Sequence, residues 1–461
     1  MPNEALFSSL NLPEAQVDNL NQLGYKTMTA IQAQSLPETI AGHDLIAQAK
    51  TGSGKTAAFG IGLLLKIVPS SFNVQALLMC PTRELCTQVA NEIRRLARYQ
   101  QNIKVVVLCG GQSIGPQIGS LEHGAHIVVG TPGRLKDHLR KETLHLNHVQ
   151  TLVLDEADRM LEMGFADDIA TIIGKTPEKR QTLLFSATYP DDIKKLSARF
   201  QKNPKVVSVE VQHERQQIEQ HFYEVRSQSE KPDALTRLLS HYAPDSAVVF
   251  CNTKQQCTDL RHHLRQAGYS ALALQGDMEQ RDRDQVLVQF SNGSSKLLIA
   301  TDVAARGLDI DDLSAVINYD LSRDNDTYTH RIGRTGRAGK QGLALSLSTL
   351  SDGRKLNAIT DGSGLNINLK STDSLPSKLN TPEPPAMVTL CIAGGRKEKI
   401  RPGDVLGALT KDAGIPGAQV GKINVFDFST YVAVERAVAN KAMNSLQNGK
   451  IKNKKVKVRR L

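Results

Sequence analysis

The sequence contains no apolar run of the roughly 18 residues needed to cross a membrane. Its first residues, Met1 to Glu4, lack the charged and then apolar layout of a signal peptide. The six cysteines form no C-x-x-C pair and no histidine cluster lies beside them, so no zinc site is expected. These absences predict a cytoplasmic protein with reduced thiols.

Net charge is concentrated in one part of the chain. Residues 387–461 contain fifteen Lys and Arg against five Asp and Glu, and this excess of +10 equals the formal charge of the whole chain. A basic segment attached to a neutral remainder indicates a polyanionic partner, most simply nucleic acid. The alternative is a solvated basic surface without a partner. The length of 461 residues suggests about three domains, and a hydrophobic content of 40% suffices for several cores.

A glycine-rich segment at residues 49–56 follows a short apolar run, 45–47, and precedes a helical pattern from Ala57. Such a turn directs backbone N–H groups and the positive end of a helix dipole toward phosphate. Lys55 would reach the outer phosphates, and the Thr56 hydroxyl would ligate Mg²⁺. The usual pattern begins with glycine, whereas this chain has alanine, the next smallest residue. The segment predicts a nucleoside triphosphate site made of Ala49, Lys50, Thr51, Gly52, Ser53, Gly54, Lys55 and Thr56.

Further continuous apolar runs predict a parallel sheet buried under helices on both faces. They lie at residues 76–80, 105–108, 127–129, 151–154 and 183–185. Each run ends in small, polar or charged residues. Because ligands bind at the carboxyl ends of strands in open α/β sheets, these ends are expected to line one crevice.

Two carboxylates directly follow the run at 151–154. Asp155 would hold Mg²⁺, and Glu156 would orient or deprotonate the attacking water. A solvated acidic loop is the alternative, and the phosphate loop earlier in the same sheet argues against it. Upstream, the amide of Gln32 can pair with an adenine edge and Phe7 can stack on the base, although a surface glutamine and a core phenylalanine are common.

The sequence Asp155-Glu156-Ala157-Asp158 is the signature of the DEAD-box RNA helicases, and the chain resembles that family over about residues 6–350. The segments around Gln32 and at 81–85, 110–111, 131–134 and 186–188 match in order, with Ala30 where proline is common. The resemblance implies ATP and Mg²⁺ as cofactors, with an adenine site including Phe7, Tyr25 and Gln32. It also implies contacts to the RNA backbone from Thr82, Arg83, Gly111, Thr131 and Arg134. Ser186 and Thr188 would link hydrolysis to strand separation.

A polar stretch around Val206 to Gln220 is expected to be a linker. Beyond it, apolar runs at 247–251, 297–300 and 316–317 predict a second α/β domain. Thr253 is the expected N-cap of a helix that Gly268 ends. This half has no phosphate loop, so it can only complete a site formed elsewhere.

Arginines alternate with glycines at residues 331–337. Arginine binds phosphate oxygens with two donors, and an arginine acting on a transferring phosphoryl group raises rates by about 10³–10⁵. This segment matches the DEAD-box motif, so Arg334 and Arg337 are the expected catalytic arginines. The resemblance also implies RNA contacts from Thr301 and Arg283 and a ribose contact from Asp309.

Residues 371–385 are rich in Ser, Pro and Thr and are expected to be a spacer. Strand-like runs follow at 387–392, 423–425, 431–434 and 456–458, with helical patterns that begin at Asp404 and run from Glu435 to Gly449. This order is that of an RNA-recognition module. Of the aromatics that usually stack bases on such a sheet, only Tyr431 is in place. Binding is therefore expected through phosphates and loops, with Lys399, Arg401, Lys454 and Lys455 as contacts. An appended domain that only packs on the helicase is the alternative.

The expected fold class is α/β, with two RecA-like domains in tandem at 1–208 and 220–370, a linker at 371–386 and a basic α+β domain like an RNA-recognition module at 387–461. This arrangement resembles one bacterial branch of the DEAD-box family. The resemblance implies a monomer that unwinds short RNA duplexes, binds hairpin 92 of 23S ribosomal RNA and takes part in large-subunit assembly. An ATP-gated RNA clamp without unwinding and a DNA-translocating helicase are the alternatives.

Overall fold

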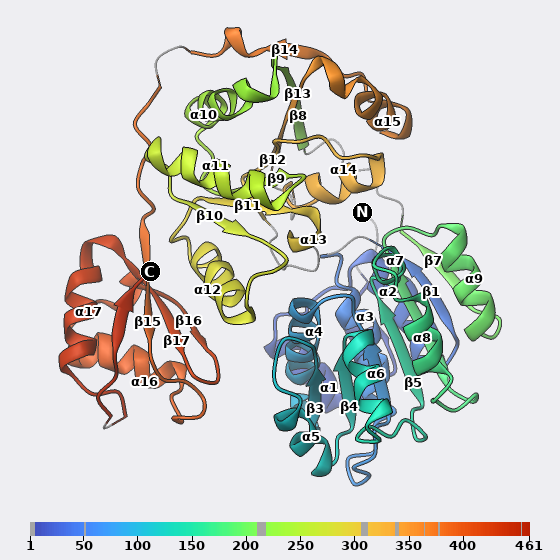
Figure 1. Ribbon diagram of the computed structural model, residues 1–461. Helices are drawn as coiled ribbons and strands as arrows, with labels where there is room; N and C mark the ends of the chain where they lie inside the picture. Colours follow the sequence, from blue (N-terminus) through green and yellow to red (C-terminus); the bar gives the residue numbers. More distant parts are fainter. Residues whose placement is uncertain are drawn as a thin grey trace. The chain divides into compact units, whose positions relative to one another are not determined.

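The computed structural model describes residues 5–49, 52–209, 218–305, 312–336, 341–363, 365–376, 379–452 and 454–461 (Figure 1). Contacts divide the chain into two units after residue 211. Among the described residues, no helix combines the length and the apolar character that crossing a bilayer requires.

The first unit is built on a seven-stranded parallel sheet with the order β3-β4-β2-β5-β6-β1-β7. Its strands are β1 (Leu45–Gln48), β2 (Ala76–Met79), β3 (Val105–Leu108), β4 (Ile127–Gly130), β5 (Thr151–Asp155), β6 (Gln181–Ser186) and β7 (Lys205–Ser208). The helices are α1 (Glu14–Gln22), α2 (Ala30–Ala41), α3 (Lys55–Leu64), α4 (Arg83–Leu96), α5 (Gly115–Glu122), α6 (Pro132–Arg140), α7 (Ala157–Glu162), α8 (Ala166–Ile173) and α9 (Asp191–Phe200). The six apolar runs predicted to be strands are confirmed.

Both faces of this sheet are buried, as the continuous apolar strands predict. In β1, Leu45 and Ala47 contribute to one core together with side chains of α1, α2, α3 and α4. Ile46, between them, contributes to the opposite core with side chains of α6, α7, α8 and α9. Because all seven strands run parallel, their carboxyl ends lie at one edge of the sheet, where the candidate site residues lie.

The second unit contains another seven-stranded parallel sheet, with the order β10-β11-β9-β12-β13-β8-β14. Its strands are β8 (Ile218–Glu224), β9 (Ala247–Cys251), β10 (Ala271–Leu274), β11 (Leu297–Thr301), β12 (Ala315–Asn318), β13 (Gly342–Ser348) and β14 (Leu369–Ser371). The helices are α10 (Lys231–Tyr242), α11 (Lys254–Gln266), α12 (Gln280–Ser291), α13 (Asp302–Ala305), α14 (Asn325–Ile332) and α15 (Gly353–Ser363). Thr253 caps α11 by accepting the N–H of Gln256, as predicted, and Gly268 follows the helix with a φ of +89°.

The linker predicted around Val206 to Gln220 is wrong at both ends. Val206 belongs to β7, which pairs with β1, and Gln220 belongs to β8, which pairs with β13. Both strands carry exposed or half-buried polar residues, because β7 is an edge strand and β8 neighbours the short edge strand β14. At these two ends, the polar pattern therefore belongs to strands and not to a linker. Residues 210–217 lie outside the described residues.

The spacer predicted at 371–385 is held against the second α/β domain at several points. Leu375 is buried in that domain's core, the N–H of Asn380 donates to Ser240 Oγ, and Glu383 pairs with Lys296 at 3.9 Å. The described part of this segment therefore packs along the surface of the second α/β domain.

The last part of the second unit is a four-stranded antiparallel sheet with the order β16-β17-β15-β18. Its elements are β15 (Met387–Ile392), α16 (Pro402–Gly407), which continues as a π-helical turn (Ala408–Asp412), β16 (Val420–Val425), β17 (Thr430–Glu435), α17 (Ala439–Asn448) and β18 (Val458–Arg460). The predicted β-α-β-β-α-β order is confirmed. Asp404, however, is not the N-cap: Arg401 occupies that position, and the Asp404 carboxylate accepts its N–H at 2.8 Å. Glu435 ends β17, so the last helix begins at Ala439.

Candidate nucleotide and RNA sites

The phosphate loop joins β1 to α3 in the first unit, as predicted. Gly52 and Gly54 have φ values of +81° and +91°, which favour glycine, and Gly54 caps α3. A Cβ on Gly54 would lie 2.4 Å from Gln32 Nε2, so the tight approach of α2 also requires glycine. Lys50 and Thr51 lie outside the described residues.

Gln32 holds this loop in the structure. Its Oε1 accepts the N–H of Thr29 at 2.9 Å, and its Nε2 donates to the carbonyl of Gly54 at 3.1 Å. Thr29 adds a hydrogen bond to the carbonyl of Ser53 at 2.9 Å. Gln32 therefore ties α2 to the phosphate loop, and its predicted contact to adenine stays a prediction.

The aromatic residues predicted at the base are packed together. Phe7 is 2% exposed, and its ring meets that of Tyr25 edge-on, with centroids 5.9 Å apart. The Tyr25 hydroxyl donates to Glu92 on α4. Phe7 thus shows almost no open face in this structure, and stacking on adenine also stays a prediction.

Lys55 and Asp155 form the buried centre of the first unit's site. Lys55 Nζ lies 3.9 Å from Asp155 Oδ1, and both side chains are almost fully buried. Within the described part of the chain, this ammonium has no hydrogen-bond acceptor. Burial raises the pKa of Asp155 to about 6, against the lowering effect of Lys55. A buried ammonium with unused donors matches the need of phosphate oxygens.

Glu156 follows in the left-handed region, with a φ of 53°, between the end of β5 and the start of α7. Its N–H donates to Asp155 Oδ1 at 3.0 Å, and its carboxylate lies 3.8 Å from Arg159 Nε. Two acidic side chains are therefore fixed at the carboxyl end of β5. Thr56 lies in the first turn of α3, directly after Lys55.

Residues predicted to contact RNA gather at the carboxyl ends of β2, β3 and β4. Thr82 caps α4, and the guanidinium of Arg83 lies so close to Gly111 that a Cβ there would be 1.6 Å from Nη1. Arg134 donates to the carbonyl of Gln112 at 3.0 Å, and Thr131 is the N-cap of α6. The structure thus brings together all five residues predicted on this edge.

The residues predicted in the second α/β domain differ in how they are placed in the structure. Thr301 ends β11, but Arg283 donates to the carbonyls of Gln275 at 3.1 Å and Ala304 at 3.3 Å and is 9% exposed. Arg283 therefore braces α12 against its neighbours here, and its RNA contact stays a prediction. Arg334 is buried in the turn after α14. Arg337 and Asp309 lie outside the described residues.

In the antiparallel domain, the four predicted RNA-binding cations, Lys399, Arg401, Lys454 and Lys455, are exposed. Tyr431, by contrast, is 1% exposed and packs with Val288 of α12 and Cys391. Thr389 on the same face contacts Asn292 at 3.2 Å and Ser294 at 2.6 Å, both next to the end of α12. Tyr431, the one aromatic in a stacking position, is therefore closed to an RNA base in this structure, because helix α12 covers that face of the sheet.

Comparison with known proteins agrees with this geometry. Residues 29–196 match the DEAD/DEAH box helicase family, 230–339 the helicase conserved C-terminal domain and 389–460 the DbpA RNA binding domain. The ATP-dependent RNA helicase DbpA of Escherichia coli is 54% identical over 99% of both chains. The chain belongs to the DEAD-box RNA helicases.

Two further similar proteins cover about three-quarters to four-fifths of this chain. CshA of Listeria monocytogenes, an ATP-dependent RNA helicase, is 47% identical over 74% of this chain and 65% of its own length. A solved structure of Dbp5 from S. cerevisiae, bound to RNA and ADP BeF3, is 30% identical and superposes with a TM-score of 0.72 over 80% of this chain and 96% of that one. The two parallel sheets are therefore tandem RecA-like domains, and the protein is an ATP-dependent RNA helicase.

The structure of this DEAD-box helicase assigns a contact to Asp158, for which sequence reasoning gave no separate role. Its Oδ2 accepts the N–H groups of Ala187 at 3.1 Å and Thr188 at 2.9 Å, and the Thr188 hydroxyl at 2.9 Å. Its own N–H donates to Ser186 Oγ at 3.3 Å. The last residue of the signature therefore holds the predicted coupling segment directly, and its place in the signature was the only sequence signal.

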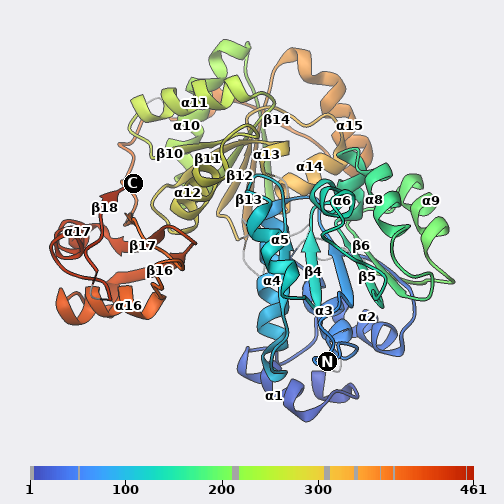
Figure 2. The ribbon, with the colours of Figure 1, turned by 60° about the horizontal axis from the view of Figure 1, so that its bottom comes forward.

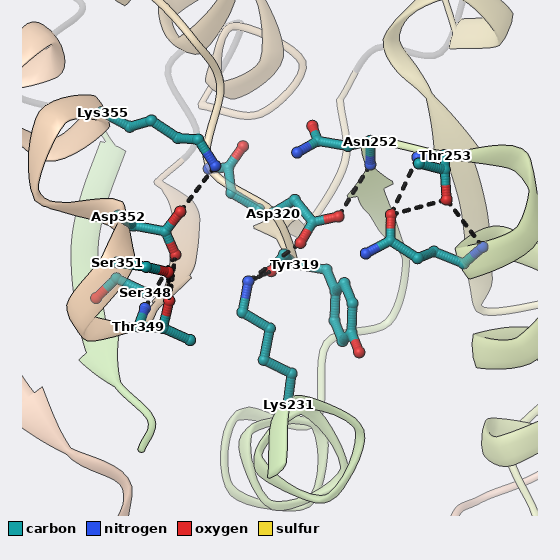
Figure 3. Close-up of polar contacts among 12 residues, drawn as sticks. Lys231, Asn252, Thr253, Tyr319, Asp320, Ser348, Thr349, Ser351, Asp352 and Lys355 are labelled. Carbon is teal, nitrogen blue, oxygen red and sulfur yellow. Dashed lines mark hydrogen bonds and ion pairs between the residues drawn. The ribbon is translucent and has the colours of Figure 1, made fainter. Parts of the chain in front are cut away.

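A buried polar network in the second RecA-like domain was missed entirely (Figure 3). Lys231, 1% exposed, donates to the carbonyl of Tyr319 at 2.9 Å and to Asp320 Oδ1 at 3.1 Å, and Asp320 Oδ2 accepts the N–H of Asn252 at 2.9 Å. Arg331 binds both carboxylate oxygens of Asp302, at 2.6 and 2.7 Å. It also donates to the carbonyl of Asp320 at 2.6 Å. These bonds join the ends of β9, β11 and β12 to α14, the helix that precedes Arg334.

Proposed function

We propose that this RNA helicase acts on 23S ribosomal RNA, at the region of hairpin 92, during assembly of the large ribosomal subunit in the cytoplasm. The observation that carries the proposal is the C-terminal domain, since residues 389–460 match the DbpA RNA binding domain. The 54% identity to E. coli DbpA extends over this domain as well as the helicase core. We propose domain boundaries at 1–208, 220–370 and 387–461, a linker at 371–386 and a monomeric protein.

For the ATP site we propose that Lys55 binds the outer phosphates and that Thr56 and Asp155 hold Mg²⁺. Within the described residues, no three His, Cys, Asp or Glu side chains are grouped to hold a metal by themselves. Mg²⁺ usually keeps waters and binds through one or two carboxylates and substrate phosphates, so a hydroxyl and one buried carboxylate beside Lys55 suit it. When bound, the metal neutralises charge on the phosphates.

The remaining roles follow from charge and position. Glu156 would orient the attacking water and accept its proton, because its carboxylate directly follows Asp155. We propose that Arg334 and Arg337 stabilise charge on the transferring phosphoryl group and that Asp309 contacts the ribose. Asp158 would couple hydrolysis of the triphosphate to the positions of Ser186 and Thr188, since it already binds the segment that contains them.

For RNA we propose backbone contacts from Thr82, Arg83, Gly111, Thr131, Arg134, Arg283 and Thr301 in the helicase core. Lys399, Arg401, Lys454 and Lys455 would bind phosphates of the ribosomal RNA. Their exposure and the excess positive charge of residues 387–461 support this assignment.

The test is the ATP hydrolysis rate of the full chain with a 23S rRNA fragment that contains hairpin 92. An unrelated hairpin of equal length and stem stability is the control. We expect half-maximal stimulation at a concentration at least tenfold lower for the ribosomal fragment. Equal stimulation by the two RNAs would overturn the proposed target while leaving the helicase assignment intact.

A further inference from the structure

The two central strands of the C-terminal domain's sheet, β15 and β17, are covered on both faces in this structure. Side chains of β15 and β17 that point one way, Leu390 and Val432 among them, pack with α16 and α17. Side chains that point the other way, Cys391 and Tyr431, pack with Val288 of α12. Figures 1 and 2 show α16 and α17 on one side of these strands and α12 on the other. An RNA base therefore cannot stack on the strands while α12 stays in place.

One aromatic side chain of this domain is nevertheless open to solvent. Phe428, in the loop between β16 and β17, is 72% exposed. Aromatic rings normally bury a large apolar area, and exposed ones are enriched at binding surfaces. Phe426, two residues earlier, is partly buried and packs edge-on against Tyr431, with centroids 5.5 Å apart. The loop thus anchors one phenylalanine on the α12 contact and presents the other outward.

Backbone hydrogen bonds join the loop that contains Phe428 to a second loop, at residues 394–399. The N–H of Arg396 donates to the carbonyl of Phe426 at 2.8 Å, and the N–H of Lys397 donates to the carbonyl of Asp427 at 3.0 Å. A Cβ on Gly395 would lie 2.1 Å from the carbonyl oxygen of Phe426, so the two backbones touch where only glycine fits. The loops 394–399 and 426–429 therefore form one rigid unit, here named the Phe428 platform, which loses little entropy when a ligand binds.

The charge beside the ring selects an anionic ligand. Arg396 and Lys397 are exposed on the platform, and Lys399 and Arg401 follow them. Two acidic residues partly offset these four cations. Asp427 pairs with Arg396 at 3.8 Å, with both side chains exposed, and Glu398 accepts the N–H of Gly395 at 2.7 Å. An exposed ring flanked by a net positive charge suits unpaired nucleotides, whose bases stack while their phosphates meet the cations.

We propose that the Phe428 platform is a binding site for unpaired RNA, in which a base stacks on Phe428 and the neighbouring phosphates contact Arg396 and Lys397. This inference rests on the proposed function in that the RNA is taken to be a hairpin with an unpaired loop. It moves base recognition from the strands, which α12 covers, to the loops at their end. The platform also touches Tyr431 through Phe426, so it is joined to the contact between the C-terminal domain and α12.

The experiment compares full-length Phe428→Ala with the parent chain for binding of the 23S hairpin fragment and of an unrelated hairpin. Leu406→Ala is the matched control, because Leu406 is an exposed apolar residue on α16 of the same domain, at 40% exposure. Loss of one stacked base predicts that Phe428→Ala weakens binding by about 5- to 100-fold for RNAs with unpaired bases. Leu406→Ala should bind like the parent, and Phe428→Tyr should restore most of the affinity.

A fluorescent base analogue in the hairpin loop gives an independent signal of stacking. Its emission should be quenched by the parent chain and by Phe428→Tyr but not by Phe428→Ala. Unchanged affinity and unchanged quenching in Phe428→Ala would overturn the proposal and would leave the exposed ring as a contact for another protein. If the parent chain binds both hairpins equally, the 23S target fails, yet the effect of Phe428→Ala on either RNA still decides the platform.

A backbone variant separates the ring from its support. Gly395→Ala keeps Phe428 but forces the two loops apart, so binding should weaken as in Phe428→Ala while the ATP hydrolysis rate without RNA stays at the parental value. Thermal unfolding of each variant checks that the domain remains folded. Parental RNA affinity in a folded Gly395→Ala chain would show that the rigid pairing of the loops is not needed.

Discussion

Asp155 is a carboxylate that the first RecA-like domain keeps out of water. Burial raises its pKa to about 6, and Lys55 opposes the rise. Above that pH the side chain is ionised and can hold Mg²⁺; below it, proton uptake competes with the metal. We therefore predict that the Kd for ATP with Mg²⁺ rises about fourfold when the pH falls from 7.5 to 5.5, as fluorescence titration with an ATP analogue would measure.

Asp155→Asn supplies the control, because it removes the titrating group and keeps the shape of the side chain. This variant should bind the nucleotide more weakly at pH 7.5. Any pH dependence that remains in it belongs to the nucleotide or to other residues. A pH dependence as steep as that of the parent would show that Asp155 is not its source.

The buried ammonium of Lys231 stabilises the second RecA-like domain through its ion pair with Asp320. Substitution to Met removes the ammonium and leaves the buried Asp320 carboxylate with the N–H of Asn252 but without its ion pair. Breaking one side of such a pair costs about 3–5 kcal/mol, so we predict that Lys231→Met lowers the Tm of this domain by roughly 10 °C. Calorimetry of the full chain would measure it.

Two comparisons test this account of Lys231. The double variant Lys231→Met with Asp320→Asn should lose less stability than the sum of the single variants, because neither charge is then left alone. Lys254→Met is the surface control in the same domain, since Lys254 and Asp277 are both exposed where they pair at 3.0 Å. It should change the Tm by only a degree or two. Additive losses would mean that the two charges do not depend on each other.

At the scale of elements, hydrophobic pattern predicted six strands of the first sheet, including the edge strand β3, and missed the edge strand β7. In the second sheet it predicted β9, β11 and β12 and missed β8, β10, β13 and β14. Strands such as β5 and β9 are buried along their whole length, and their sequences are continuous apolar runs. The edge strand β7 buries one residue in four, and the first four residues of β8 are exposed or half-buried, so both resembled a linker. Only hydrogen bonds to distant strands define them, and sequence pattern does not contain that information.

Among the candidate site residues, too, local sequence motifs predicted some, while others are brought together only by the fold. Local motifs predicted Lys55, Asp155 and the cluster around Arg83, because each depends on a turn directly after a strand. Lys231 and Asp320 are 89 residues apart and share no motif, so only the fold joins them. The burial of Tyr431 depends on α12, which lies in another domain of the sequence. The sequence pattern of the small domain alone therefore does not reveal that α12 covers one face of its sheet.

The contact between α12 and the small sheet centres on Thr389, which is fully buried and bridges Asn292 and Ser294. Thr389→Val keeps the shape but leaves these two polar groups without their partner, at a cost of about 1–3 kcal/mol. We predict faster hydrogen–deuterium exchange in peptides from α12 and β15. Thr410→Val is the control, because the Thr410 hydroxyl donates to the carbonyl of Leu406 within its own helical segment. Equal exchange in both variants would show that Thr389 does not hold the contact.

At the scale of the whole molecule, ATP hydrolysis should depend on the arginines of the second RecA-like domain. We predict that Arg337→Ala keeps the affinity for ATP but lowers RNA-stimulated hydrolysis by about 10³-fold or more, as loss of an arginine on the transferring phosphoryl group implies. Arg354→Ala, at an exposed position on α15, is the control for loss of one positive charge. Parental turnover in Arg337→Ala would remove this residue from the reaction.

The distribution of charge predicts how the small domain directs the enzyme. Removal of residues 387–461 takes away the entire net charge of +10 and leaves a core with none. Because each neutralised phosphate contributes about 0.7–0.9 to the slope of log affinity against log salt, the truncated chain should show a much shallower slope. It should also lose its preference for the ribosomal fragment and require at least tenfold more of that RNA for half-maximal ATP hydrolysis.

Truncation also uncovers Val288 on α12, so a variant that leaves this contact intact is needed. Lys454→Glu with Lys455→Glu reverses two exposed charges that are not part of the cluster formed by Val288, Cys391 and Tyr431. Salt dependence should fall in this full-length variant too, by a smaller amount, while hydrolysis without RNA stays at the parental rate. If the truncated chain loses affinity and the charge-reversed chain does not, the domain directs the helicase through groups other than these two lysines. The Phe428 platform would then carry the larger share of binding.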